Sequence, residues 1–259
     1  MPSVFLLMSL VFVVGCTGGW PHRTSKDRPT LTIGAASDLM PVFTEIREDL
    51  KTEDSVEIVF SFGSSGVLTK QVEEGAPFDM LATASASYIQ RVKAAGLSVH
   101  GTEMVFARGR LVLWSRSDSE PRIASLNDLI LPQVKRIAVA NPEHAPYGRA
   151  AQEVLRSISI WDAIREKLVY SENVGQAFQF AHTGNADAAF ISSSLVPPSD
   201  GRTISVDPRY HSPINQSICI LRRTQLGASA RAFVNFLGSP AGKTVLEKFG
   251  FQPLTQSIP

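Results

Sequence analysis

The chain has 259 residues, a formal net charge of +1 and 44% hydrophobic residues. Behind a leader of ordinary length, this is enough chain for two lobes, each the size of a typical domain. The near-neutral charge excludes nucleic acid from the expected partners, because binding a polyanion normally leaves a basic footprint on the protein.

The chain opens with an apolar run at residues 4–14, which has the length of a signal-peptide core and is too short to cross a bilayer as a helix. The run ends in Val13-Val14-Gly15-Cys16, which resembles a bacterial lipobox. This resemblance implies that residues 1–16 are a lipoprotein signal peptide and that Cys16 is lipidated after cleavage. The polar residues 17–29 are then a linker. The alternative is a buried N-terminal helix.

Two details qualify this leader. Met1-Pro2-Ser3 contains no Lys or Arg, which a signal peptide normally has, so the true start codon stays open. The second cysteine, Cys219, would have no partner if Cys16 is acylated, so no disulfide is expected. Because Cys219 lies in an apolar run, we expect a buried thiol that packs as a small hydrophobic side chain.

Beyond the linker, short apolar or alternating runs that end in small residues predict strands. They cover residues 31–36, 56–62, 80–84, 110–115, 136–140, 167–171 and 188–192. Helical patterns follow Ser37, Ser65, Tyr147 and Asn173, where apolar residues recur on one face. This alternation predicts an α/β fold with doubly wound, mainly parallel sheets and helices on both faces. Ligands of such sheets bind at the carboxyl ends of the strands.

Small polar residues occupy five of these strand-to-helix junctions. The junctions are residues 35–39, 62–66, 141–148, 172–175 and 190–194. Helix N-termini carry unpaired N–H groups and a partial positive charge, so several that converge form an anion site without Lys or Arg. Ser37 also suits the N-cap of its helix. Glycines on both sides of Ser64 and Ser65 allow a backbone to approach an oxyanion closely, with both hydroxyls available to it.

The same segments, in the same order, resemble the periplasmic molybdate-binding proteins, the substrate-binding components of molybdate ABC transporters. The matching residues are 32–39, 60–66, 71–79, 141–148 and 241–251. The resemblance implies a bilobal periplasmic binding protein of type II-like topology, with two doubly wound lobes joined by two crossover segments. Lobe one would comprise residues 30–108 and 213–259, and lobe two residues 109–212. We expect the extended crossings within residues 109–115 and 212–222.

The resemblance also implies a ligand site for molybdate or tungstate. The hydroxyl and backbone N–H groups of Ser37 and Ser65 would hold the anion from lobe one, and the backbone N–H groups of Tyr147 and Val174 from lobe two. The family often has a tyrosine where this chain has Ser192, so the fifth contact is left open between Ser192 and the phenol of Tyr147. No cofactor or resident metal is implied, and the protein would meet the metal of the anion only through these contacts.

The chemistry of the ligand agrees with such a site. Molybdate and tungstate are dianions without a proton near neutral pH, so donors alone suit them, whereas a phosphate site would need an acceptor. Discrimination from sulfate would rest on cavity size, because the donor pattern is the same for both. The carboxylate of Asp38 would repel a dianion, and we therefore expect it to point away as a charge in the first helical turn.

The expected function is an extracytoplasmic, membrane-anchored and monomeric binding lipoprotein that serves an ABC transporter permease. Another oxyanion, such as sulfate, is the alternative ligand, and a regulator-type ligand-sensing domain is a further alternative. Catalysis is disfavoured because the histidines are scattered without HExxH spacing, and no GxSxG or Walker motif appears. The histidines are His22, His100, His144, His182 and His211.

Overall fold

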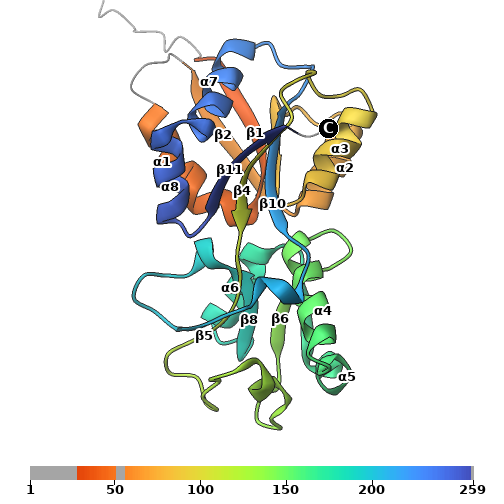
Figure 1. The fold of residues 1–259 in the computed structure, drawn as a ribbon, viewed down its shortest axis with the longest axis vertical. Coiled ribbons are helices and arrows are strands. Elements are labelled where there is room, and N and C mark those ends of the chain that lie inside the picture. Colours follow the sequence, from red (N-terminus) through yellow and green to blue (C-terminus); the bar gives the residue numbers. More distant parts are fainter. Residues whose placement is uncertain (1–27, 51–55, 258–259) are drawn as a thin grey trace, which may run out of the picture.

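The computed structural model describes residues 28–50 and 56–257. The expected signal peptide, its Cys16 and most of the linker lie outside these described residues. Two α/β lobes are stacked along the long axis, and the chain passes twice between them (Figure 1). No helix among the described residues is both long and apolar enough to span a membrane.

Lobe one contains a six-stranded sheet in the order β11-β4-β10-β3-β1-β2. Its strands are β1 (Thr30–Ala36), β2 (Glu57–Gly63), β3 (Met80–Thr83), β4 (Met104–Gly109), β10 (Ile214–Ile220) and β11 (Gln252–Ser257). Helices α1 (Met40–Leu50), α7 (Gly227–Gly238) and α8 (Pro240–Lys248) cover one face, and α2 (Ser65–Glu73) and α3 (Ala86–Ala94) cover the other (Figure 1). The short helix η1 (Ser37–Leu39) joins β1 to α1.

Lobe two contains a five-stranded sheet in the order β7-β6-β8-β5-β9. Its strands are β5 (Leu111–Ser115), β6 (Ile137–Ala140), β7 (Leu168–Ser171), β8 (Ala188–Ser192) and β9 (Arg202–Ser205). Its α-helices are α4 (Pro146–Ser157), α5 (Trp161–Ile164) and α6 (Val174–His182). Short 3₁₀ helices are η2 (Leu126–Ile130), η3 (Arg165–Lys167), η4 (Ser193–Leu195) and η5 (Pro208–Tyr210).

The bilobal α/β class expected from the sequence is confirmed, but the sheets are mixed and not mainly parallel. β1 pairs in parallel with β2 and β3, whereas β10 is antiparallel to both β3 and β4. In lobe two, β5 is antiparallel to β8 and β9. The antiparallel strands are those that adjoin the passages between the lobes, because each enters its sheet from the lobe boundary.

The crossings are shorter than expected. β5 belongs to the sheet of lobe two and β10 to that of lobe one. The chain changes lobes at Arg110 and again between β9 and β10, over residues 206–213. An extended crossing and a strand share the same apolar pattern, so the sequence alone could not separate them.

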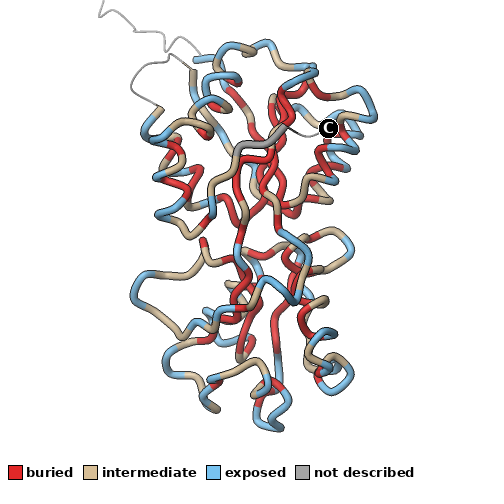
Figure 2. Tube along the Cα trace, viewed as in Figure 1, coloured by how far each residue is buried: buried red, intermediate tan, exposed pale blue. Residues whose placement is uncertain are grey.

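The burial of each strand fits its central or edge position in the sheet. All five residues of the central strand β8 are buried, which fits its unbroken apolar run, whereas the edge strand β2 is largely exposed on alternate residues. Phe43 on α1 packs edge-on against Phe233 on α7, with ring centroids 5.1 Å apart. Buried residues continue through both lobes and along the strands that join them (Figure 2). The lobe boundary is therefore part of the core, and it is here that the polar junctions meet.

Candidate anion-binding site

Helix N-termini from both lobes converge on one small cavity at the lobe boundary. It is lined by residues 36–38, 63–65 and 84 of lobe one and by residues 145–147 and 173–174 of lobe two. The space open to the centre of a water-sized sphere is about 10 Å³, so the cavity has room for one small molecule or ion. None of the described residues that line it is Lys, Arg or His. Backbone N–H groups in the first turns of helices have no partner within their own helix and are available to a ligand.

Four of the five residues predicted to bind the anion meet at this cavity: Ser37, Ser65, Tyr147 and Val174. The fifth, Ser192, does not line it. Ser192 is completely buried at the end of β8, and its hydroxyl donates to the Tyr147 hydroxyl at 2.9 Å. The structure therefore places Ser192 behind Tyr147, away from the cavity.

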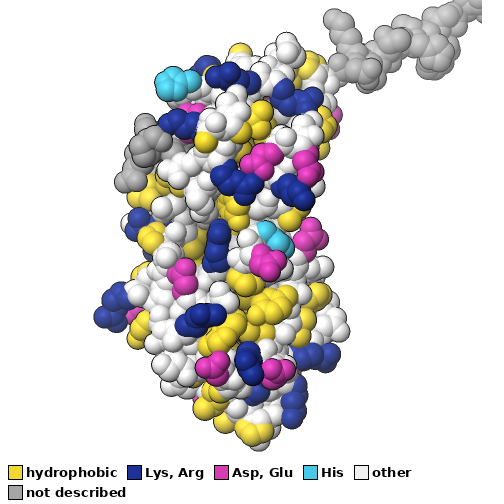
Figure 3. Space-filling model, turned by 90° about the vertical axis from the view of Figure 1, so that its right-hand side faces the viewer, with side chains coloured by type: hydrophobic (Ala, Val, Ile, Leu, Met, Phe, Trp, Pro, Cys, Tyr) yellow, Lys and Arg dark blue, Asp and Glu magenta, His cyan; other side chains and the backbone are white. Residues whose placement is uncertain are grey.

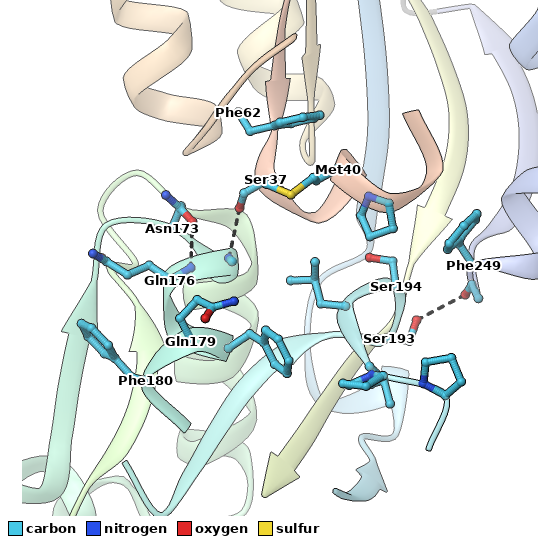
Figure 4. Close-up of a pocket in the computed structure, with 18 of the residues that line it drawn as sticks. Ser37, Met40, Phe62, Asn173, Gln176, Gln179, Phe180, Ser193, Ser194 and Phe249 are labelled. Carbon is cyan, nitrogen blue, oxygen red and sulfur yellow. Dashed lines mark hydrogen bonds between the residues drawn. The ribbon is translucent and has the colours of Figure 1, made fainter. Parts of the chain in front are cut away.

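The hydroxyls of Ser37 and Ser65 are both held as acceptors of backbone N–H groups. Ser37 Oγ accepts from the N–H of Gly175 in lobe two at 3.1 Å, a bond that Figure 4 shows. Ser65 Oγ accepts from the N–H of Ala84 at 3.0 Å. Because each oxygen already accepts a hydrogen bond, its own O–H remains to donate to a ligand.

Ser37 does not cap its helix, which corrects the N-cap expectation. The helix η1 begins at Ser37 itself, the N-cap residue is Ala36, and no side chain caps this end. The Ser37 side chain instead bonds across the lobe boundary to Gly175. In lobe two, Asn173 does cap α6, because its side chain accepts from the N–H of Gln176 at 3.0 Å (Figure 4). A capped first turn of α6 holds the N–H of Val174 at the cavity.

Ser64 joins the two lobes and is not available as a second anion-binding hydroxyl. Its hydroxyl lies 2.7 Å from the carbonyl oxygen of His144 and 2.8 Å from Nδ1 of the same residue. The same carbonyl accepts from the N–H of Gly66 at 2.9 Å and from the hydroxyl of Tyr88 at 3.2 Å. Arg149 of lobe two donates to that Tyr88 hydroxyl at 3.2 Å. We call these five residues the latch, and it holds the lobes closed.

Asp38 is not the exposed first-turn charge that the sequence suggested. The residue is 1% exposed and is among those that line the cavity. Its Oδ2 accepts from Nε2 of Gln216 at 2.7 Å, and Oδ1 has no hydrogen-bond partner among the described residues. Burial raises the pKa of the Asp38 carboxyl to about 7. Sequence reasoning missed Gln216, although a glutamine within the apolar β10 run was a signal of a buried polar contact.

The hydroxyl of Tyr147 lies near Gln216 and Gly109, at the crossing between the lobes. Its hydroxyl accepts from Nε2 of Gln216 at 3.4 Å, and a Cβ built at Gly109 would lie 2.1 Å from this hydroxyl. The phenol therefore reaches the crossing between β4 and β5, where only a glycine leaves room for it. Burial, together with the negative charge of Asp38, raises the pKa of Tyr147 well above its usual value. At neutral pH the phenol is a neutral structural group, and Tyr147 is among the residues that line the cavity.

A second, wider cavity of about 1330 Å³ adjoins the first on the side of Ser37. Apolar side chains dominate its wall, among them Met40, Phe62 and Phe249 (Figure 4). It is open to solvent, and its polar lining residues, which include Lys248, are spread among the apolar ones. On the outer surface, acidic and basic side chains are interspersed over both lobes, without a large patch of one sign in the view of Figure 3. The described residues contain no cluster of His, Cys, Asp and Glu that could hold a metal ion.

Two α/β lobes, crossed twice by the chain and closed over a cavity of helix N-termini, define a solute-binding protein. The comparison with known families agrees: residues 31–252 match the model of the bacterial extracellular solute-binding proteins, and the chain belongs to this family. Its fold class and its resemblance to molybdate-binding proteins are both supported by the relatives that it matches.

Several relatives are named for molybdate. The chain is 32% identical to the molybdate-binding protein ModA of Rhodobacter capsulatus, over 83% of this chain and 82% of that protein. It is 30% identical to YvgL of Bacillus subtilis, a putative ABC transporter substrate-binding lipoprotein, over 96% of this chain and 97% of that one. The solved periplasmic molybdate-binding protein of Azotobacter vinelandii superposes with a TM-score of 0.81 at 26% identity, covering 87% of this chain and all of that one.

The latch predicts that Gly66→Ala prevents full closure. An added Cβ would lie 2.7 Å from Cβ and 2.9 Å from the carbonyl oxygen of His144, which belongs to the other lobe. The lobes would have to separate, so we expect solute affinity to fall about tenfold or more, while the solute-free protein keeps its fold. Calorimetric titration and small-angle scattering would measure both. In the control Gly238→Ala the added methyl meets nothing within 4 Å, and equal affinities of the two variants would contradict this role of the latch.

The burial of Asp38 predicts a pH-dependent stability. The pKa of Asp38 is raised from 3.8 to about 7 in the folded chain, so the folded state binds more protons than the unfolded state between these values. Stability is therefore lost as pH rises from about 4 to about 7. Asp38→Asn removes this loss, and we expect it to stabilise the solute-free protein at pH 8 by up to about 4 kcal/mol, with the gain vanishing toward pH 4. Urea unfolding at both pH values measures the difference, and a gain that does not depend on pH would contradict it.

Proposed function

We propose that this protein captures molybdate, and also tungstate, in the cavity between its lobes and delivers the anion to an ABC transporter permease. The observation that carries the proposal is the convergence of Ser37, Ser65, Tyr147 and Val174, two from each lobe, on one small cavity without a basic side chain. The molybdate-binding relatives support the choice of ligand. The role is capture and release, without a chemical change in the solute.

The chemistry of the cavity fits a tetrahedral dianion. Hydrogen bonds to a charged group contribute about 1.5–3 kcal/mol each, so several of them support sub-micromolar binding, at about −8 kcal/mol or beyond, after the costs of association and closure. Sulfate would meet the same donors and is the alternative ligand. A sulfate-binding protein of Mycobacterium tuberculosis shares the fold with a TM-score of 0.71, but at 16% identity it supports the architecture alone. Size is then the property by which the site separates these anions.

The location follows from the leader. We propose that Cys16 carries lipid and tethers a monomeric protein to the outer side of a membrane, with no nucleic-acid partner and no cofactor. The Bacillus subtilis relative is named as a lipoprotein, and its match extends over 96% of this chain. One acyl chain binds a membrane only weakly, so stable attachment requires more than one chain on the anchor.

Removal of the Ser65 hydroxyl tests the ligand and the site together. Ser65→Ala removes one donor from the buried anion, so we expect molybdate affinity to fall about tenfold to a hundredfold, or about 1.5–3 kcal/mol. The backbone N–H group survives, and binding should weaken without vanishing. Titration calorimetry with molybdate and with tungstate measures the effect.

Two controls accompany this variant. Ser65→Ala also leaves the N–H of Ala84 without its partner, so its melting temperature must be measured on the same preparation. Ser87→Ala removes an exposed hydroxyl that bonds to Ser85, and this variant should bind the anion as the parent does. If Ser65→Ala also binds both anions as tightly as the parent, the assignment of the site is wrong.

Cys16→Ser tests the anchor. Without the thiol no lipid can be attached, and we expect the protein to move from the membrane fraction to the soluble extracytoplasmic fraction. Fractionation of cells, followed by detection of the chain with an antibody, measures the distribution. Retention of the Cys16→Ser protein in the membrane would instead favour an uncleaved N-terminal helix.

A further inference from the structure

Among the described residues that line the small cavity, Asp38 is the only acidic one, and none is basic. Its side chain is 1% exposed, and Oδ1 has no hydrogen-bond partner among the described residues. The lining of the proposed anion site thus includes an acidic residue whose carboxylate is buried. Donor groups alone do not explain why this acid is there.

The elements packed around Asp38 supply no opposite charge. Tyr147 of α4 and Gln216 of β10 are neutral, and Ser194 of η4 donates to the Asp38 backbone carbonyl at 2.7 Å. Among the described residues, no ion pair includes Asp38.

The charged and ionisable groups on the neighbouring helices are engaged elsewhere. Arg149 of α4 bonds to Tyr88, and Glu153 of α4 accepts from the N–H of Ser212. His144, just before α4, bonds to Ser64, and His182 of α6 lies near Asp200. On α1, Glu45 pairs with Lys248. An ionised Asp38 would therefore be an uncompensated buried charge.

A dianion in the cavity would add electrostatic repulsion to the cost of an ionised Asp38. Like charges that share a buried site disfavour ionisation of the acid, by the same effect that separates the two protons of a paired-carboxylate site. Burial alone already brings the pKa of Asp38 to about 7 in the anion-free protein. Protonation is thus the easiest way to remove the repulsion.

We propose that Asp38 is neutral in the anion complex, so that the site takes up one proton together with each fully deprotonated oxyanion. This inference rests on the proposed function. Asp38 then determines specificity through charge. When Asp38 is protonated, the site binds a fully deprotonated dianion. When Asp38 is ionised, the site binds only an anion that still carries a proton. Capture of molybdate becomes weaker in alkaline surroundings and stronger in acidic ones.

The size of the effect follows from linkage. Below pH 7 the acid is already protonated and binding needs no proton from solution. Above pH 7 the Asp38 carboxylate must take up a proton from solution for the anion to bind. The dissociation constant of the anion therefore rises by up to tenfold per pH unit. With a pKa of about 7, affinity at pH 8.5 should be about 30-fold weaker than at pH 6, with about one proton taken up per anion.

Calorimetric titration of the chain with sodium molybdate at pH 6 and pH 8.5 tests this. Two buffers of different ionisation enthalpy at each pH give the number of protons taken up. Asp38→Asn keeps the shape of the side chain and its acceptor oxygen but has no proton to gain. We expect this variant to bind with no proton uptake and with the same affinity at both pH values. Glu143→Gln, which neutralises an exposed acid in the loop before α4, should keep the uptake of one proton.

The outcomes are distinct. Tight binding by the parent at both pH values without proton uptake overturns the inference and leaves the proposed function intact. Proton uptake that persists in Asp38→Asn also overturns it. Absence of molybdate binding at pH 6 overturns the proposed function and the inference together. If Asp38→Asn fails to fold, the proton count of the parent and of Glu143→Gln decides the question.

Discussion

The need of helix N-termini for hydrogen-bond partners is the constraint on which this structure depends. Residues at the starts of η1, α2, α4 and α6 line one cavity, and the first N–H groups of a helix have no partners within that helix. A protein interior rarely leaves such groups unpaired, because an unsatisfied buried donor costs about 1–3 kcal/mol. An anion between the lobes satisfies several donors at once, and it brings no new positive side chain into the core.

This constraint also explains why the two lobes close on each other. The donors come from both lobes, so neither lobe alone can surround a ligand. The latch around the carbonyl of His144 and the bond from Gly175 to Ser37 align the halves of the site on opposite sides of the cavity. Tyr147, Gln216 and Asp38 form a hydrogen-bonded polar cluster near the crossings between the lobes.

The sequence predicted the elements better than their pairing. Every predicted strand exists, because an apolar run that ends in small residues is a local signal. The strands β4, β9, β10 and β11 were missed, since β11 carries polar residues at a sheet edge and β10 lay within an expected crossing. Mixed sheet order arises from contacts distant in sequence, which no local pattern records.

The site residues show the same difference between what local sequence patterns predict and what contacts distant in sequence decide. Ser37, Ser65, Tyr147 and Val174 could be named because the resemblance to the molybdate-binding proteins implies these positions, and because the helix starts on which they lie are visible in the sequence. The burial of Asp38 could not, because it depends on Gln216, which is 178 residues away. The roles of Ser64 and Ser192 were likewise decided by partners from other parts of the chain, His144 and Tyr147.

The position of the metal in crystals grown with molybdate tests the central claim most directly. Anomalous diffraction at the molybdenum absorption edge locates that atom without reference to the protein. The account predicts one strong peak in the small cavity between Ser37, Ser65 and Val174, with only oxygen atoms of the anion bonded to the metal. A peak in the wide cavity beside Phe62 and Phe249, or no ordered peak between the lobes, would contradict it.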